Sequence, residues 1–183
     1  VEKNITKSLE LYQQSGDLGN SYALYNLGVH YMKGIGVEKN DTKAIEYYQK
    51  AADLGDSDAI YNLGLCYENG IGVEQNSTKA FEYYKEASDL DNSDAMYSLG
   101  ICYENGRGVE QSYSKAIYFY SKSASKENSY ALLSLGNLYE NGNGVERNAE
   151  KAFEFYQKSA SLGNSDALVN IGLCYENGIG VNQ

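Results

Sequence analysis

The stretch GDSDAIYNLGLCYENGIGVEQNSTKAFEYYKEASDL, residues 55–90, returns along the chain every 36 residues without a gap. Related stretches begin at Gly19, Asp91 and Glu127, and a partial copy begins at Gly163. A fixed period of this length indicates stacked supersecondary units, each of which buries its apolar face against its neighbours. The sequence therefore predicts a repeat array without a single central core.

The period divides the 183 residues into whole and half units. The predicted units are a half unit at 1–18, full units at 19–54, 55–90, 91–126 and 127–162, and a half unit at 163–183. The chain opens on VEKN, which corresponds to Val37–Asn40 inside a unit, so we expect the array to be cut from a longer one. The half unit at each end exposes an apolar face, which predicts head-to-tail self-association of two copies.

Each unit is predicted to hold two helices, which we call helix A and helix B. In the unit of residues 55–90, Asp56 carries a side-chain oxygen suited to a helix N-cap, and helix A is expected over residues 58–69. Gly70 suits the left-handed cap that ends a helix. Asn76 caps helix B, which is expected to end at about Asp89.

Helix A has one apolar face when its residues are placed at 100° intervals. The glycine on this face, Gly64 in the unit quoted, costs about 1 kcal/mol relative to alanine, so its recurrence predicts that helix B crosses there at close range. Ten tyrosines at two repeat positions are predicted core aromatics that join helix A to helix B. They are Tyr31, Tyr67, Tyr103, Tyr139 and Tyr175, and Tyr12, Tyr48, Tyr84, Tyr120 and Tyr156.

The composition argues against several classes of partner. The formal net charge is −10, which disfavours nucleic acid and anionic membranes as main partners, because both need a basic surface. No apolar run approaches the roughly 20 residues of a membrane-spanning helix.

The cysteines Cys66, Cys102 and Cys174 share one repeat position, at which neighbouring units are about 8–10 Å apart. This spacing is too wide for a disulfide, so we expect free thiols beside the core. A metal site is not expected, because the ligands do not converge and His30 is the single histidine. Free thiols favour the cytoplasm, whereas glycosylation sequons such as Asn40-Asp41-Thr42 leave a secreted or luminal location open.

The register of A-x-x-N-L-G-x-x-Y-x-x-G-x-G-V, followed by K-A and Y-Y-x-x-A, resembles the Sel1-like repeat, a cousin of the tetratricopeptide repeat. The resemblance covers the whole chain and implies a right-handed α-solenoid with a concave face lined by helices A. It also implies that the asparagine of N-L-G meets the backbone of a bound peptide, which points to Asn26, Asn62 and Asn170. Family members act as adaptors, so the resemblance implies a scaffold that binds a protein or peptide.

The open side of helix A is the candidate recognition surface. Besides the three asparagines, the candidates on it are Tyr25, Tyr61, Tyr97, Asp58 and Asp94. Aromatic anchors beside amides suit an extended peptide. The alternative is that the tyrosines are contacts between neighbouring units. The acidic residues of this side, which include Glu68 and Glu104, are expected to form a solvated face that favours basic partners.

No arrangement of residues points to catalysis or to a cofactor. The loop GIGVEQN lacks the third glycine, the preceding strand and the lysine of a phosphate-binding loop. No histidine or lysine clusters with the carboxylates to act as acid, base or nucleophile. The sequence predicts an interaction module that is not an enzyme. Two alternatives remain open: an accessory array beside a catalytic domain outside this chain, and a purely structural array.

Overall fold

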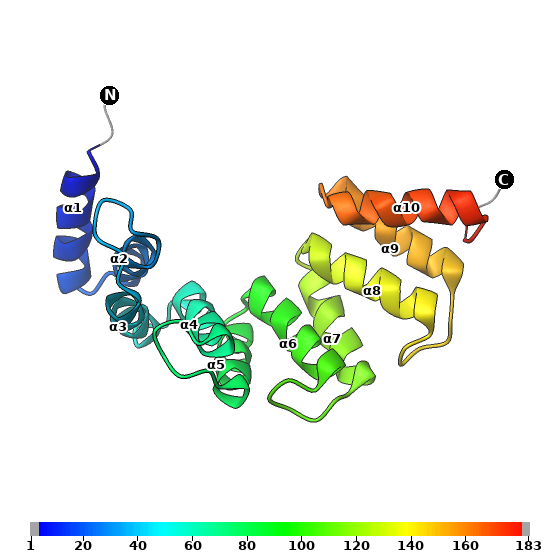
Figure 1. Ribbon diagram of the computed structural model, residues 1–183, viewed down its shortest axis with the longest axis horizontal. Helices are drawn as coiled ribbons and strands as arrows, with labels where there is room; N and C mark the ends of the chain where they lie inside the picture. Colours follow the sequence, from blue (N-terminus) through cyan, green and yellow to red (C-terminus); the bar gives the residue numbers. More distant parts are fainter. Residues whose placement is uncertain (1–3, 181–183) are drawn as a thin grey trace. The chain divides into compact units, whose positions relative to one another are not determined.

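Ten α-helices and no β-strand make up the part of the chain that the computed structural model describes, residues 4–180. In chain order they are α1 (Ile5–Asp17), α2 (Ser21–Lys33), α3 (Asp41–Ala52), α4 (Ser57–Asn69), α5 (Ser77–Asp89), α6 (Ser93–Asn105), α7 (Tyr113–Ala124), α8 (Ser129–Asn141), α9 (Ala149–Ser161) and α10 (Ser165–Asn177). The even-numbered helices are the predicted helices A, and the odd-numbered helices are the predicted helices B (Figure 1). None of these described helices is both long and apolar enough to span a membrane.

The helix ends follow side-chain capping. The Oδ1 atoms of Asn40 and Asp56 accept the backbone N–H groups of Lys43 and Ala59, each at 2.9 Å, at the starts of α3 and α4. Helix A ends at a glycine in the left-handed region, such as Gly70 with φ 68°. Because the capping oxygen belongs to Asp56, α4 begins at Ser57, one residue before the predicted start.

The turn from helix B to the next helix A keeps one backbone conformation even where its glycine is replaced. Gly55 and Gly163 have φ values of 81° and 86°. Asp91 and Glu127 stand at the same repeat position and have φ values of 69° and 62°. A side chain is strained at such a φ, so the repeat holds these two residues in a conformation that they would otherwise avoid.

A glycine of helix A meets a tyrosine of helix B in each complete repeat. A Cβ atom added to Gly28 would lie 2.5 Å from the ring of Tyr48, and one added to Gly64 would lie 2.5 Å from the ring of Tyr84. Gly100 and Gly136 meet Tyr120 and Tyr156 in the same way, and all four rings are at most 2% exposed. The predicted close crossing of the two helices is therefore confirmed.

The predicted core tyrosines that belong to helix A lie nearer the surface than those of helix B. Tyr31 is half-buried and stacks on Tyr47 of helix B, with ring centroids 5.5 Å apart, and Tyr67 stacks on Tyr83 at 5.4 Å. The prediction is wrong for Tyr175, which is 61% exposed because no helix B follows α10 among the described residues.

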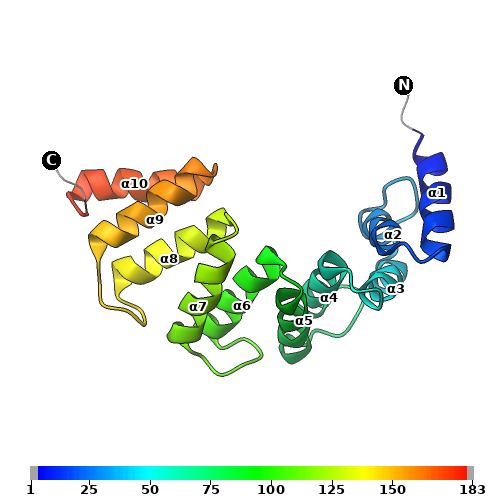
Figure 2. The same ribbon diagram turned by 180° about the vertical axis from the view of Figure 1, so that it is seen from behind.

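Within residues 4–92 and within residues 93–180, helices pack on their neighbours in sequence. The described helices divide into two compact parts, which we call the first unit and the second unit from here on. The first unit holds α1–α5 and the second unit holds α6–α10 (Figure 1), and Figure 2 shows each unit from behind. The largest contacts join a helix A to the helix B of its own repeat, as in α2 with α3 and α8 with α9. This sequential packing is that of an α-solenoid, so the predicted fold class is confirmed.

The glycine loop after helix A also joins neighbouring repeats. A Cβ atom on its second glycine would collide with the helix B of the preceding repeat, as at Gly36 against Ile5 of α1. The same approach places Gly72 against Ile45 of α3. The loop lies on the preceding helix B because glycine presents no side chain there.

The three cysteines are buried free thiols, as predicted. Burial, aided by the nearby charge of Asp41, raises the pKa of the Cys66 thiol from 9.0 to about 11. Burial raises the pKa of Cys174 as well, with a contribution from Glu140.

Candidate functional site

The candidate surface is formed by the helices A, and it is described separately in the two units. We call it the A-helix surface. In the first unit it is built on α2 and α4, and in the second on α6, α8 and α10. The eight predicted residues are divided between them. Tyr25, Asn26, Asp58, Tyr61 and Asn62 lie in the first unit, and Asp94, Tyr97 and Asn170 lie in the second.

The three candidate tyrosines each pack on the buried tyrosine of their own helix B. The ring centroids of Tyr25 and Tyr48 are 5.9 Å apart, and those of Tyr61 and Tyr84 are 5.7 Å apart. Tyr97 packs on Tyr120 in the same way, at 5.7 Å. Each candidate ring is half-buried. One side of the ring therefore belongs to the core of its repeat, and the remainder faces the A-helix surface.

Tyr25 of α2 lies near Asp58 and Asn62 of α4, so three of the predicted residues come together there. Its pKa is raised by burial and then by the charge of Asp58, while a hydrogen bond with the Asn62 side chain acts in the opposite direction. In the second unit the corresponding partner of Tyr97 is Ser134, and the ring of Tyr130 lies 6.0 Å away. A tyrosine of one helix A thus meets the next helix A in both units.

Asn26 and Asn62 are held in the same way by their own helices. The Nδ2 of Asn26 donates to the carbonyl of Tyr22, and the Nδ2 of Asn62 donates to the carbonyl of Asp58, both at 2.7 Å. The Asn62 side chain also forms the hydrogen bond with Tyr25 described above. Each amide is therefore held in a fixed orientation on the A-helix surface.

Asn170 is arranged differently from the other two asparagines. Its Nδ2 donates to the Oδ1 of Asn137 on α8 at 3.2 Å, and that oxygen also accepts the Tyr156 hydroxyl at 2.9 Å. Asn137 is exposed, as are Val169 and Leu173 on α10. The surface of the second unit is therefore a small amide network beside exposed aliphatic side chains.

Asp94 links the starts of α6 and α8, and Asp58 binds Asn92 within the first unit. The Oδ1 of Asp94 accepts the Nδ2 of Asn128 at 3.0 Å, and the Oδ1 of Asn128 in turn accepts the backbone N–H of Ala131 at 3.1 Å. The Oδ1 of Asp58 accepts the Nδ2 of Asn92 at 2.8 Å. Both aspartates are exposed. One carboxylate oxygen of each is thus engaged within the repeat array.

A set of tyrosine–glutamate hydrogen bonds was not expected from the sequence. The hydroxyls of Tyr84, Tyr120 and Tyr156 donate to Glu68, Glu104 and Glu140 at 2.6, 2.5 and 2.6 Å. These glutamates are half-buried, so the expectation of a simply solvated acidic face is wrong for them. The sequence does contain a signal for these hydrogen bonds, which is a glutamate that recurs at one repeat position beside an otherwise apolar face. Met32 replaces it in the first full repeat.

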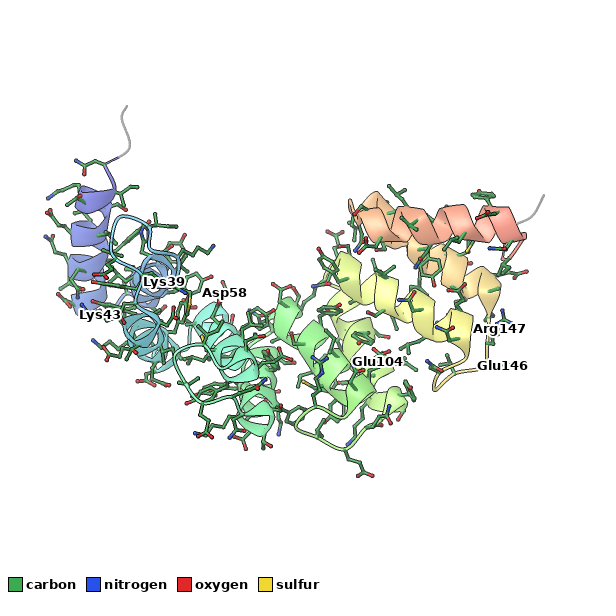
Figure 3. The ribbon with its side chains drawn as sticks, viewed as in Figure 1. Lys39, Lys43, Asp58, Glu104, Glu146 and Arg147 are labelled. Atoms are coloured by element: carbon green, nitrogen blue, oxygen red, sulfur yellow. The ribbon has the colours of Figure 1, made fainter. Side chains whose placement is uncertain are left out.

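Two hollows beside glycine loops are lined in part by basic residues. One is lined by Tyr31, Val37, Glu38, Lys39, Asn40 and Lys43, and its counterpart by Tyr139, Val145, Glu146, Arg147, Asn148 and Lys151. Figure 3 labels Lys39 and Lys43 in the first, and Glu146 and Arg147 in the second. The lysine of helix B lies over the tyrosine ring, with Lys43 Nζ 5.2 Å from the Tyr31 centroid. This cation–π contact holds the hollow together.

The described residues contain no group of three or more His, Cys, Asp or Glu side chains that could hold a metal ion. On the A-helix surface, the pKa values of Tyr25 and Tyr97 are raised, and the main cause is burial. A neutral phenol on this surface can donate or accept a hydrogen bond and present an aromatic face. The arrangement is therefore suited to binding by packing and hydrogen bonds.

Solved structures resemble most or all of the chain. A protective antigen present in uropathogenic Escherichia coli strains, which displays an SLR fold, matches with a TM-score of 0.93 and 33% identity over 100% of this chain and 39% of its own. A Sel1 repeat protein from Oxalobacter formigenes matches with a TM-score of 0.88 and 29% identity over 97% of this chain and 78% of its own. Cysteine-rich protein B of Helicobacter pylori matches with a TM-score of 0.57 and 32% identity, over 71% of this chain and 93% of its own.

The chain thus spans 39% of the length of the Escherichia coli antigen. No curated protein sequence matches it significantly. The model of the Sel1 repeat family matches residues 1–20, 21–56, 57–92, 93–128, 129–164 and 165–183. The resemblance drawn from the repeat register is confirmed, and the chain belongs to the Sel1 repeat family.

Proposed function

We propose that the A-helix surface binds an extended peptide segment of a protein partner, and that Asn26 and Asn62 read its backbone. The observation that carries the proposal is the pair of matched amides on α2 and α4. Each Nδ2 is held by its own helix at 2.7 Å, which fixes the orientation of the amide and of its Oδ1 acceptor. A peptide backbone supplies N–H donors at regular intervals, which suits acceptors repeated from one helix A to the next.

The tyrosines beside these amides would supply the apolar contacts. Tyr25 and Tyr61 are half-buried, and their orientation is fixed by packing on Tyr48 and Tyr84. Rigid aromatic side chains provide contact area at a low cost in conformational entropy. In the second unit, Tyr97 and the exposed Tyr130 would take the same part, with Asn170 and Asn137 as the nearby amides.

The charge of the surface favours a basic partner segment. Asp58 and Asp94 are exposed and keep one carboxylate oxygen free of the hydrogen bonds described above, and the chain carries a net charge of −10. Sel1 repeat proteins are generally protein-interaction scaffolds, and the repeat is a non-catalytic fold. The proposal accordingly gives the chain an adaptor role and no reaction of its own.

The test begins with a peptide selected from a random library displayed on phage and made synthetically. Its affinity is measured for the wild type, for the Asn26→Ala/Asn62→Ala variant and for an Asn69→Ala/Asn141→Ala control. The control asparagines donate to their own helix carbonyls, Leu65 and Asn137, at 2.9 Å each, so they lose the same kind of bond. They lie exposed at the last turns of α4 and α8.

Loss of two hydrogen bonds of about 1 kcal/mol each should weaken binding by the Asn26/Asn62 variant about tenfold or more. The control variant should bind as the wild type does. A scan of singly N-methylated peptides should identify backbone N–H groups whose removal weakens wild-type binding but has no further effect on the Asn26/Asn62 variant. Equal affinity of all three proteins, with no such coupling, would exclude backbone readout by these asparagines.

A further inference from the structure

Two tyrosine rings from neighbouring helices A meet on the A-helix surface of the second unit. The ring centroids of Tyr97 on α6 and Tyr130 on α8 are 6.0 Å apart, and the angle between the ring planes is 36°. Tyr97 is half-buried, whereas Tyr130 is 57% exposed. The two rings therefore form one aromatic surface, and Tyr130 is the part of it that is most open to solvent.

The core of the repeat holds Tyr97 in place. Its ring packs on the buried ring of Tyr120 at a centroid distance of 5.7 Å, and its side chain forms a hydrogen bond with Ser134 of α8. A ring that is already fixed by its neighbours loses little conformational freedom when a ligand packs beside it. The aromatic surface is therefore organised before any partner arrives.

A carboxylate lies beside these rings. Asp94 is exposed and stands three residues before Tyr97, on the same face of α6. Its Oδ1 accepts the Nδ2 of Asn128 at 3.0 Å, and Asn128 caps α8 two residues before Tyr130. Among residues 4–180, no lysine or arginine forms an ion pair with Asp94. The carboxylate is therefore held near both rings, and its negative charge is not neutralised by an ion pair.

An arginine side chain is the ligand that fits a flat aromatic surface beside a carboxylate. The guanidinium ion is planar and weakly hydrated, so it can lie over a tyrosine ring while its N–H groups donate to a carboxylate in its own plane. A lysine ammonium ion is compact and strongly hydrated, so it gains less from the ring. The net charge of the chain, −10, favours a cationic group of either kind.

We propose that Tyr97, Tyr130 and Asp94 bind an arginine side chain of the partner segment, with the guanidinium over the Tyr130 ring and its N–H groups donating to the Asp94 carboxylate. The inference rests on the proposed function, because the arginine belongs to the segment that the A-helix surface binds. It adds to that function a preference for arginine over lysine, which the amides of the first unit do not provide.

The repeat itself supplies a variant that separates stacking from charge. Aspartate stands at the repeat position of Tyr130 in the other repeats, as Asp58, Asp94 and Asp166, so the Tyr130→Asp variant is compatible with the fold. The substitution removes the exposed ring and adds a negative charge. If charge alone attracts the partner, every basic peptide should bind this variant at least as tightly as it binds the wild type. If the ring stacks on a guanidinium, the preference for arginine should fall.

The test compares two fluorescent, capped octapeptides, one of arginine and one of lysine, by fluorescence anisotropy. The wild type should bind octaarginine about threefold or more tightly than octalysine, because stacking of a cation on a ring contributes about 0.5–1 kcal/mol or more. In the Tyr130→Asp variant this ratio should fall toward one. The control is Tyr118→Glu, because Tyr118 is 55% exposed on α7 and glutamate stands at its repeat position in α3 and α9. The control should keep the ratio of the wild type.

A second pair of variants tests the carboxylate. Asp94→Asn retains an oxygen that can accept the Asn128 bond and removes the charge, so it should weaken the binding of octaarginine. Asp89→Asn removes the same charge at an exposed position at the end of α5 and should weaken the binding less. In NMR spectra, octaarginine should shift the ring signals of Tyr97 and Tyr130 and leave that of Tyr118 in place.

The Asn26→Ala/Asn62→Ala variant separates this inference from backbone readout. It should keep the ratio of the wild type, because its amides belong to the first unit and do not contact the guanidinium. Failure of backbone readout would therefore leave the preference for arginine intact. A wild-type ratio of one, an unchanged ratio in Tyr130→Asp, or an equal fall in Tyr118→Glu would overturn the arginine site.

Discussion

The buried tyrosine of helix B combines packing and hydrogen bonding in one side chain. Tyr84, Tyr120 and Tyr156 fill the space beside a glycine of helix A and donate their hydroxyls to a glutamate one turn further along that helix. Tyr48 fills the same space, but Met32 takes the place of the glutamate. The four repeats therefore include a natural comparison for the value of the hydroxyl.

Replacing Tyr156 by phenylalanine should lower the free energy of unfolding by about 1–2 kcal/mol, because the hydroxyl donates to a carboxylate. The same change at Tyr48 should cost less than about 1 kcal/mol, because no described side chain accepts its hydroxyl there. Urea denaturation of the two variants and the wild type measures the difference. Equal losses for the two would show that the glutamate contributes nothing to stability.

At this scale the sequence predicted the burial of Tyr48, Tyr84, Tyr120 and Tyr156 and missed what the hydroxyls of the last three bind. The burial of Tyr48 and Tyr120 follows from repeat position, since small and large residues recur together. The bond to Glu104 depends on two side chains from different helices whose rotamers converge, and a helical projection of either helix alone does not contain that information. Tyr175 was misassigned because burial at its position needs a helix B that follows it.

The elements are joined through their ends. The N-cap asparagine of one helix A also donates to an aspartate of the preceding helix A, as Asn128 does to Asp94. Asn128 thus has the capping role predicted for Asp56 at the same repeat position, and the pattern of caps did not reveal its link to the preceding repeat. The aspartates were chosen from the sequence as partner-binding residues because they recur on the open side, and the same recurrence serves the link between repeats.

A double-mutant cycle on Asp94 and Asn128 should measure this link. The coupling energy between Asp94→Ala and Asn128→Ala is expected to be about 0.5–1 kcal/mol, because the pair is a charge-assisted hydrogen bond at an exposed site. Asn164 provides the control, since Tyr130 stands where an aspartate would be needed. Thermal and urea unfolding of the wild type, the two single variants and the double variant gives the coupling energy. A coupling energy of zero would show that Asn128 acts as a helix cap and does not stabilise the link to Asp94.

At the scale of the whole molecule, the buried phenols and thiols should make stability fall at alkaline pH. Burial raises the pKa of Tyr48, Tyr120 and Tyr156 above 10.0, and it raises the pKa of Cys66 from 9.0 to about 11. The unfolded chain loses these protons first as the pH rises. Their contribution to stability is therefore complete below a pH of about 9 and is lost as the pH rises through the raised values.

Urea midpoints measured from neutral pH upward should be constant at first and then decline above a pH of about 9. Tyrosinate absorbance should rise in two stages, with the second accompanying the loss of helical circular dichroism. Ionisation of every tyrosine near its ordinary pKa, with the helices intact, would contradict the burial described here.

The overall fold could be predicted because the same sequence pattern recurs in every repeat. Local errors, such as the start of α4, do not accumulate, because each repeat contacts its neighbours alone. The candidate surface was less predictable. Its residues follow from helix angles, but whether Asn26 is bonded to its own helix or Asn170 to Asn137 depends on atoms from several residues.

The most direct test of the recognition proposal is a titration of the chain with the selected peptide, followed through the side-chain amide signals of asparagine in ¹⁵N–¹H NMR spectra. The account predicts that the Asn26 and Asn62 signals shift with the same affinity as the binding curve, while those of Asn69 and Asn141 stay in place. Saturable binding that shifts Asn69 and Asn141, or helix B signals, and leaves Asn26 and Asn62 unmoved would place recognition on another surface and contradict the account.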